Sequence, residues 1–478
     1  MTSDSRAPIL ARNASVQYPD RARPALEGIT ERISPGEAVV VTGPSGCGKS
    51  TFCRAICGFI PELVPARVEG ELRVEGLSVW ETDAARLGTH VGLVQQDADA
   101  QICTLGVEDE VAFGPENLCL PRKEIDKRVH RAMDAVGIES LRGRRTTTLS
   151  GGEKQRLAIA SILAMEPKIL LLDEPTAHLD PAGASQLFGL LRDLRQRLGL
   201  TLLVVEHRLG PLAALSPRVV ILDEGRIVLR RPDRSHHERL GEGSKLEEER
   251  LTGAEPRVRV SDLAFSYGAP LLQGITFHVR AGEVLGVIGP NGGGKTTLLR
   301  LLAGLEDPLL GRIETDAEVG FVFQHPHHQI FERTVDRELA IADIPAREPL
   351  ESWLVEGRLE GLGNAPPLSL SLGEQRRLTL ITALQRRPGI LLLDEPFIGQ
   401  DRRNVEWIVT RIRDESRRGA SIVLVSHDVD LLSMLADRVL YLDPAIEQPI
   451  YGVPADVFQR LCSTGRDAFV PGFWEAGS

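Results

Sequence analysis

Short apolar runs alternate with helical stretches along the whole chain. Runs of four or five mostly β-branched or leucine residues stand at 38–42, 169–172, 201–205 and 390–393. Each is as long as a buried strand, and the first is followed by a helical stretch at 49–58. This alternation is typical of an α/β fold with a mostly parallel sheet. None of the runs approaches the ~18 apolar residues of a membrane-spanning helix, so another subunit would have to cross any membrane involved.

Two long segments carry the same landmarks in the same order, which indicates an internal repeat. The first has Tyr18, 43–50, Gln96, 149–156, 169–175 and His207, and the second has Tyr267, 289–296, Gln324, 370–377, 390–396 and His427. The second copy is shorter in its middle, largely before Gln324. Between the copies, 231–256 is rich in Arg, Glu, His and Gly, as in an exposed linker. We therefore expect domains at 1–231 and 257–478, joined by a linker at 232–256.

Composition narrows the class of protein. The 478 residues are 42% hydrophobic and 26% charged, as in globular proteins. A net charge of −11 argues against a general nucleic-acid binder. The six cysteines form no Cys-x-x-Cys pair, which excludes a zinc signature and favours packed thiols in a reducing compartment. Residues 1–14 carry charges and no apolar stretch, so we expect no secretory signal and a cytosolic protein.

A glycine-rich loop that binds phosphate is predicted in each copy. Residues 43–50 match the pattern Gly-x4-Gly-Lys-Ser/Thr directly after an apolar strand and directly before a helix, and 289–296 repeat it. Backbone N–H groups and the helix N-terminus would face the phosphates, Lys49 would reach the β and γ phosphates, and the Ser50 hydroxyl would face Mg²⁺. The predicted nucleotide contacts are Gly43, Pro44, Ser45, Gly46, Cys47, Gly48, Lys49, Ser50 and Thr51, and then Gly289, Pro290, Asn291, Gly292, Gly293, Gly294, Lys295, Thr296 and Thr297.

Each copy also has an apolar strand that ends in two acids followed by proline. Asp173 and Asp394 would help to hold Mg²⁺ near Ser50 and Thr296, and Glu174 and Glu395 would polarise a water aligned on the γ phosphate. His207 and His427 each follow a later apolar strand. A lone histidine there is more often structural, but its recurrence in both copies favours a catalytic role.

At this point the chain resembles tandem ABC ATPase domains over nearly its whole length. The family marker is present as Leu149-Ser150-Gly151-Gly152-Glu153, and the second copy departs from it with Leu370-Ser371-Leu372-Gly373-Glu374. The resemblance implies two phosphate-loop domains, each with a RecA-like core and a helical signature subdomain, that bind ATP and Mg²⁺. It also places Tyr18 and Tyr267 against adenine, and Gln96 and Gln324 near Mg²⁺.

In that family two domains pair head to tail, so each ATP is held by one phosphate loop and the other signature. The resemblance therefore pairs Lys49 with Ser371, Leu372 and Gly373, and Lys295 with Ser150, Gly151 and Gly152. Glu153 and Glu374 are also among the predicted nucleotide contacts. We expect both sites to hydrolyse ATP. Leucine in place of glycine makes the Leu372 site the weaker one.

A further run, 111–118 with sequence Val-Ala-Phe-Gly-Pro-Glu-Asn-Leu, is similar to the ATPases of energy-coupling factor importers of vitamins and metals, which the second copy echoes at 323–331. That resemblance implies a T-type membrane scaffold subunit, a substrate-binding membrane subunit, and a peripheral position at the cytoplasmic face. The alternatives are a soluble tandem ATPase acting on ribosomes or nucleic acid and a tandem sugar-import ATPase. His325, His327 and His328 suggest a metal site, but a polar loop on the coupling surface is the stronger interpretation.

Overall fold

The computed structural model describes residues 7–19, 21, 23–44, 46–177, 179–206, 210–232, 255–341, 349–446, 448–472 and 474. The chain divides into two compact units, 1–179 with 183–235 and 236–478 with 180–182. Each unit contains sheets and helices, which confirms the predicted α/β class. The linker predicted at 232–256 lies largely outside the described residues, and its end residues Pro232 and Pro256 belong to strands.

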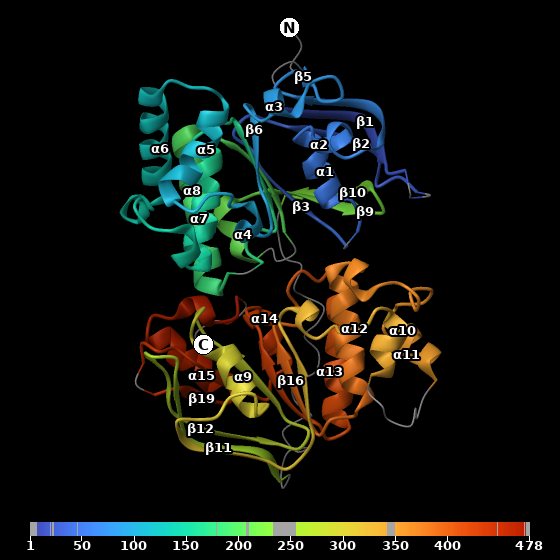
Figure 1. Ribbon diagram of the computed structural model, residues 1–478, viewed down its shortest axis with the longest axis vertical. Helices are drawn as coiled ribbons and strands as arrows, with labels where there is room; N and C mark the ends of the chain where they lie inside the picture. Colours follow the sequence, from blue (N-terminus) through green and yellow to red (C-terminus); the bar gives the residue numbers. More distant parts are fainter. Residues whose placement is uncertain are drawn as a thin grey trace. The chain divides into compact units, whose positions relative to one another are not determined.

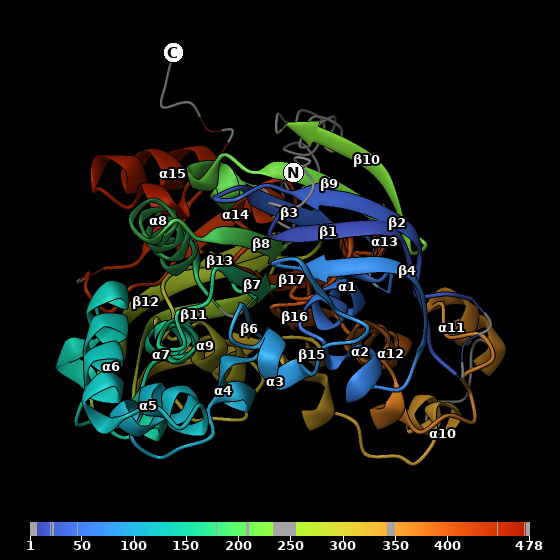
Figure 2. The ribbon, with the colours of Figure 1, turned by 90° about the horizontal axis from the view of Figure 1, so that it is seen from above.

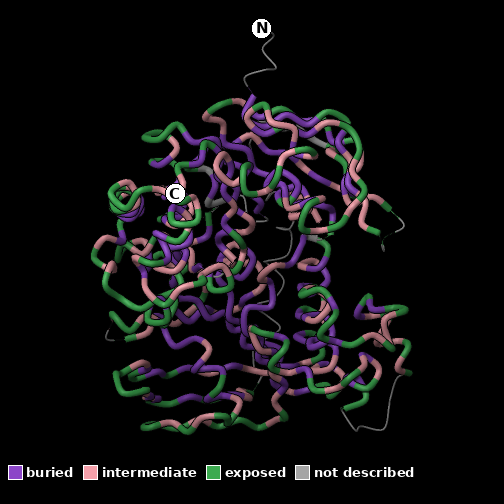
Figure 3. Tube along the Cα trace, turned by 45° about the horizontal axis from the view of Figure 1, so that its top comes forward, coloured by how far each residue is buried: buried purple, intermediate pink, exposed green. Residues whose placement is uncertain are grey.

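The central sheet of the first unit has six strands in the order β10-β9-β3-β8-β7-β6. Its strands are β3 (Ala38–Thr42), β6 (Val91–Val94), β7 (Ile169–Asp173), β8 (Thr201–Val205), β9 (Arg218–Asp223) and β10 (Arg226–Pro232). All neighbours are parallel except β9 and β10. Residues 201–205 are buried throughout, and Figure 3 shows such buried segments in purple. Both faces of the sheet are covered, which explains why the runs are continuously apolar.

A second, antiparallel sheet lies beside the first phosphate loop helix. It contains β1 (Ile9–Gln17), β2 (Leu26–Ile33), β4 (Arg67–Val74) and β5 (Leu77–Ser78), and Figure 2 shows β1, β2 and β4 side by side. Helix α1 (Lys49–Ile56) buries Phe52, Cys53 and Ile56 in one core with residues of both sheets. The short helices α2 (Phe59–Glu62) and α3 (Ala84–Leu87) follow in the same part. This core anchors the helix that follows the phosphate loop.

The remaining helices of the first unit form the helical subdomain around α7. They are α4 (Ala98–Gln101), α5 (Val107–Asn117), α6 (Arg122–Val136) and α7 (Gly151–Leu163), and α8 (Pro181–Leu198) follows β7. Figure 1 shows α5, α6 and α7 gathered together, with α1 on the other side of β6. Leu157, Ile159 and Met133 are fully buried in the shared core of these helices and the central sheet.

The second unit repeats this plan in a shorter form. Its central sheet, in the order β15-β16-β17-β13-β18-β19, contains β13 (Val284–Ile288), β15 (Val319–Val322), β16 (Ile390–Asp394), β17 (Ser421–Val425), β18 (Arg438–Tyr441) and β19 (Ile450–Gly452). A three-stranded sheet contains β11 (Pro256–Ser266), β12 (Pro270–Arg280) and β14 (Leu310–Thr315). The chain passes almost directly from β14 to β15, where the first unit has β5 and α3. The shorter middle predicted from the sequence is therefore confirmed.

The helices of the second unit are α9 (Lys295–Leu302), α10 (Val335–Ala340), α11 (Leu350–Glu356), α12 (Leu372–Gln385), α13 (Arg402–Arg417), α14 (Val429–Ser433) and α15 (Pro454–Ser463). Helix α9 follows the second phosphate loop, and α12 follows the second signature. Figure 1 shows α10, α11 and α12 near one another, as α5, α6 and α7 are in the first unit. Among the described residues, no helix combines the length and the apolar character needed to cross a membrane.

Candidate functional site

The two glycine-rich loops require glycine because the backbone passes close to its neighbours. Gly43 has φ +150°, and a Cβ there would lie 1.9 Å from the backbone oxygen of Leu222. Gly289 repeats this with φ +149° and a Cβ 2.0 Å from the backbone oxygen of Leu442. A side chain at either position is sterically excluded. Glycine is therefore required at both positions, as the phosphate-loop pattern predicts.

The loop lysines lie across these turns. Lys49 Nζ donates to the backbone oxygens of Gly43 and Pro44, at 2.8 and 2.9 Å. Lys295 Nζ donates in the same way to Gly289 and Pro290, also at 2.8 and 2.9 Å. Both lysines are buried, and burial lowers the pKa of Lys295. A buried ammonium group held against a glycine-rich turn at the start of a helix fits a polyphosphate.

Oxygen donors suited to Mg²⁺ stand beside each loop. Thr296 Oγ1 donates to Asp394 Oδ2 at 2.8 Å, and Ser50 makes the equivalent side-chain hydrogen bond with Asp173. Burial raises the pKa of both aspartates. Oδ1 of each aspartate is buried and has no hydrogen-bond partner among the described residues. A hydroxyl group, a carboxylate and an unsatisfied carboxylate oxygen fit a magnesium ion, so the predicted donor set is compatible with the group.

The two candidate general bases follow β7 and β16 and adopt a left-handed backbone conformation. Glu174 has φ +48° and Glu395 has φ +50°, which is unusual for residues other than glycine. Glu174 N donates to Val205 O and Glu395 N donates to Val425 O, both at 3.0 Å. Residues held in such conformations cluster at functional sites. The bend turns each glutamate out of the line of its strand.

Different neighbours contact the two glutamates. Gln96 Nε2 donates to Glu174 Oε2 at 3.1 Å, which brings two of the predicted residues together. In the second unit His427 N donates to Glu395 Oε2 at 3.1 Å, and His427 Nε2 lies 3.4 Å from Glu395 Oε1. His427 therefore lies beside Glu395, and its catalytic role stays a prediction. Ser45 and His207 lie outside the described residues.

The predicted adenine-stacking tyrosines have different surroundings. The hydroxyl of Tyr18 lies 3.2 Å from Thr51 Oγ1, at a cavity of about 640 Å³ whose lining also includes Lys49 and Glu174. Tyr267 is 60% exposed, and its hydroxyl donates to Glu306 Oε1 at 3.2 Å. Tyr18 therefore shares a cavity with the first loop, and contact of either ring with a base stays a prediction.

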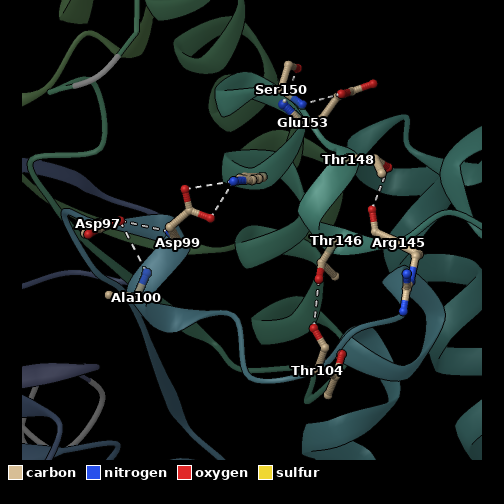
Figure 4. A network of polar contacts seen from close by, with 10 residues as sticks. Asp97, Asp99, Ala100, Thr104, Arg145, Thr146, Thr148, Ser150 and Glu153 are labelled. Atoms are coloured by element: carbon tan, nitrogen blue, oxygen red, sulfur yellow. Dashed lines mark hydrogen bonds and ion pairs between the residues drawn. The ribbon is translucent and has the colours of Figure 1, made fainter.

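Each signature serine caps the helix that follows it. Ser150 N donates to Glu153 Oε2 at 2.7 Å, and Glu153 N donates to Ser150 Oγ at 3.4 Å, as Figure 4 shows at the start of α7. Ser371 and Glu374 form the same capping box at the start of α12. This reciprocal pair satisfies N–H groups at the helix start. Glu153 and Glu374 thus have a local structural role, and their contact with nucleotide stays a prediction.

Sequence reasoning missed two pairs of residues that shape the loops after Gln96 and Gln324. Gln101 accepts from Gln95 N at 2.9 Å and donates to Leu93 O at 3.1 Å, and Gln329 contacts Phe323 and Phe321 in the same way. Each of these glutamines stands five residues after Gln96 or Gln324, and this repeated spacing was the sequence signal that could have found them. The buried residues Glu110 and Glu338 each accept two backbone N–H groups, from Cys103 and Thr104 and from Phe331 and Glu332.

The two copies differ where this loop meets the signature helix. In the first, Lys154 Nζ on α7 lies 2.6 Å from Asp99 Oδ1, and Figure 4 shows Asp99 beside Asp97 and Ala100 on the α4 loop. In the second, His325, His327 and His328 occupy the loop, exposed and with ring centroids 4.3 to 5.6 Å apart. Across the described part of the chain, no group of three or more His, Cys, Asp or Glu side chains is placed to hold a metal. The polar-loop interpretation of the three histidines stays a prediction.

Comparison with known proteins places this geometry in a family. The family model described as ABC transporter matches residues 26–177 and 272–398. A provisionally named ABC transporter ATP-binding protein of Methanosarcina mazei is 34% identical, over 89% of this chain and 86% of that protein. A Bacillus subtilis relative provisionally named HMP/thiamine import ATP-binding protein YkoD is 33% identical, over 93% of this chain and 91% of its own length.

Among solved structures, one that is similar to this chain is archaeal ribosome recycling factor aABCE1, determined in complex with the archaeal ribosomal stalk protein aP1. The match covers 95% of this chain and 92% of the aABCE1 chain, with a TM-score of 0.67. Its sequence is 23% identical, so that likeness shows the fold alone. The matched segments contain both phosphate loops and both acidic strand ends. The chain belongs to the ABC transporter family, as a tandem protein that binds and hydrolyses ATP.

Proposed function

We propose that this chain is the ATP-hydrolysing subunit of an importer of the energy-coupling factor type. It would lie peripherally at the cytoplasmic face of the membrane, on a T-type scaffold subunit that is joined by a substrate-binding membrane subunit. The observation that carries the proposal is an exposed apolar surface after the glutamine loop of each copy. The relative provisionally named for HMP/thiamine import supports the transport role.

The docking face, as we define it, is present once in each unit and consists of Leu105 and Phe113 in the first unit, and of Phe331 and Ile341 in the second. Their exposed fractions are 65%, 46%, 77% and 42%. Phe113 lies on α5 within the run 111–118, whose Val111 is fully buried, so the run packs on one side and offers an aromatic ring on the other. Exposed large apolar side chains that gather on a surface are typical of a site for another protein. A cytoplasmic apolar helix of the scaffold is the proposed occupant.

The chemistry proposed at each site follows from the side chains present. Lys49 and Lys295 neutralise phosphate charge, and Glu174 and Glu395 accept a proton from the water that attacks the γ phosphate. Mg²⁺, held near Ser50 with Asp173 and near Thr296 with Asp394, would supply positive charge to the phosphate oxygens. His427 holds the Glu395 carboxylate through its backbone N–H. Head-to-tail pairing, which the family resemblance implies, would complete each site with the opposite signature.

Charge on the docking face should release the chain from its membrane partner. The double variant Phe113→Glu/Phe331→Glu is expected to lower co-purification with membranes by about 10-fold or more, because each carboxylate would be buried against apolar surface. The measurement is the amount of chain recovered with the membrane fraction of its own cells. Leu198→Glu, which changes another leucine that is 54% exposed, is the matched control and should associate normally.

Retention of the double variant on membranes would contradict the docking face. Wild-type protein that sediments with ribosomes, with no polytopic subunit in the membrane fraction, would instead support a soluble tandem ATPase. That outcome would refute the importer role without affecting the assignment of the ATP sites.

The two signatures should contribute unequally to hydrolysis. Leu372→Gly is expected to raise total ATPase activity or leave it unchanged, whereas Gly151→Leu should lower it by about 10-fold, since a bulky residue hinders close approach of signature N–H groups to the γ phosphate. A Cβ at Gly151 meets nothing within 4 Å, and Leu372 is 41% exposed, so both variants should fold. The measurement is steady-state hydrolysis with the membrane partner present.

Variants of the candidate bases isolate the two sites in this experiment. Glu395→Gln should be the more damaging single change, because it removes the site at Lys295 that the intact signature completes. A harmless Glu395→Gln together with an inactive Glu174→Gln would show that the asymmetry runs the other way.

A further inference from the structure

We propose that Arg376 is a positioning residue for the second ATP site, which holds the main-chain carbonyl of Glu395 and so fixes the direction of its carboxylate. Arg376 lies on α12 and Glu395 follows β16. Figure 1 labels this helix and this strand. The inference deepens the proposed function and rests on the assignment of Glu395 as general base.

The backbone of Glu395 needs holding because its conformation is unfavourable. With φ +50°, this glutamate occupies a region that side chains other than glycine rarely adopt. Such a residue persists only where its surroundings over-determine it. The bond from Glu395 N to Val425 O fixes one end of the residue, at 3.0 Å. The carbonyl at the other end needs a partner of its own.

The turn that follows gives this carbonyl little support. Ile398 N donates to Glu395 O at 3.5 Å, the limit of a hydrogen bond. In the first unit the equivalent bond, from Ala177 N to Glu174 O, is 3.1 Å long. Arg376 Nη1 donates to Glu395 O at 2.5 Å, so a guanidinium supplements the weak turn bond. Bonds from a charged donor are shorter and stronger than neutral ones.

Arg376 is buried near the two acidic residues at the end of β16. It is 7% exposed, and burial lowers its pKa to about 10 while the carboxylates of Glu395 and Asp394 oppose that change. The guanidinium therefore remains charged at neutral pH. A buried cation is costly unless it has anionic and hydrogen-bonding partners. Here Glu395 and Asp394 supply the nearby negative charge and the Glu395 carbonyl accepts from Nη1, while Nε is buried with no hydrogen-bond partner among the described residues. The guanidinium and the acidic end of β16 therefore interact as one buried charged cluster.

The first unit has a neutral residue at the equivalent position. Aligning Ser150 with Ser371 places Gln155 opposite Arg376. Gln155 is 5% exposed, and its Nε2 has no hydrogen-bond partner within the described ranges. The turn bond to Glu174 O is shorter there, and the residue opposite Arg376 is uncharged. Arginine is therefore present in the copy whose turn bond is weak.

The test uses the full chain with Glu174→Gln, so that turnover reports the site of Glu395. Arg376→Gln is expected to lower kcat about 10- to 100-fold and to leave KM for ATP within about twofold, because a displaced base slows the chemical step without removing phosphate contacts. Arg376→Lys keeps a charged donor and should recover kcat to within about fivefold of the parent. Thermal unfolding of each variant is measured alongside.

Arg377→Gln is the matched control, since Arg377 is an equally buried arginine of α12. It donates to Gly357 O at 2.8 Å and Asn404 Oδ1 at 2.9 Å, away from Glu395. Its kcat should stay within about threefold of the parent, because the bond to the base is intact. Equal kcat values for Arg376→Gln and Arg377→Gln, or a change confined to KM, would overturn the inference.

Two further outcomes distinguish failure of the Arg376 role from failure of the assignment of Glu395 as general base. If Arg376→Gln does not fold, Arg376→Lys decides, and a folded lysine variant that loses about 10-fold or more of kcat overturns the role of the guanidinium. Glu395→Gln in the same background is the reference. Full turnover there refutes the general base and this inference together, whereas loss of turnover there with normal kcat in Arg376→Gln refutes Arg376 alone.

Discussion

Replacing Glu174 and Glu395 together with glutamine should reduce ATP turnover about 10²- to 10⁴-fold, the usual loss for a general base. The amide has nearly the same shape as the carboxylate but cannot accept the proton of the attacking water. The lysines of both loops remain, so ATP binding should persist and the protein should accumulate in an ATP-filled form. Phosphate release and equilibrium nucleotide binding measure the two effects.

A buried carboxylate elsewhere gives the control for this experiment. Glu31→Gln removes a charge from β2, where the carboxylate lies 3.0 Å from Arg218 Nη1, and should leave turnover near the wild-type rate. The single changes Glu174→Gln and Glu395→Gln should each leave one hydrolysing site. Normal turnover in the double variant would remove the catalytic assignment of both residues.

Lys49→Ala and Lys295→Ala should each weaken ATP binding at one site by about 10- to 100-fold. A hydrogen bond to a charged group contributes about 1.5 to 3 kcal/mol, and each 1.4 kcal/mol is a tenfold change in affinity. Both ammonium groups are already buried over their loops, so the phosphate replaces contacts rather than ordering a free side chain. Calorimetric titration with ATP gives the affinity and the number of sites for each variant.

Lys168→Ala is the matched control for the loss of a lysine. Lys168 is a surface residue paired with Glu75, and its removal should leave ATP affinity unchanged. Two ATP sites of unaltered affinity in Lys49→Ala or Lys295→Ala would refute the assignment of the loops.

The phosphate loops and acidic strand ends were predictable because their chemistry depends on residues adjacent in sequence. The backbone at Gly43 and Gly289 passes so close to its neighbours that only glycine fits. Each apolar strand ends at an aspartate, Asp173 or Asp394, and this change from apolar to acidic residues is visible in the sequence. The parallel sheet was predictable for a related reason, since strands buried on both faces are continuously apolar. The shortened middle of the second copy followed from landmark spacing alone.

Other features depend on packing between distant residues, which no local pattern encodes. The contact of Arg376 with Glu395 depends on how α12 lies against the end of β16. The left-handed conformation of Glu174 and Glu395 likewise depends on contacts at the ends of β7 and β16. The exposed fractions of Phe113 and Phe331 likewise depend on which side of each segment is covered. The loop-shaping role of Gln101 and Gln329 had a signal in the repeat, but a repeated glutamine does not reveal which backbone groups it contacts.

The central claim is that one polypeptide contains two complete ATP sites. The most direct test counts the ATP molecules retained per chain by the Glu174→Gln/Glu395→Gln variant, separated from free nucleotide as a protein of known oligomeric state. Two ATP per polypeptide, falling to one when Lys49→Ala or Lys295→Ala is added, is the predicted result. One ATP per polypeptide before either lysine is changed, or retention that neither lysine variant alters, would contradict the account.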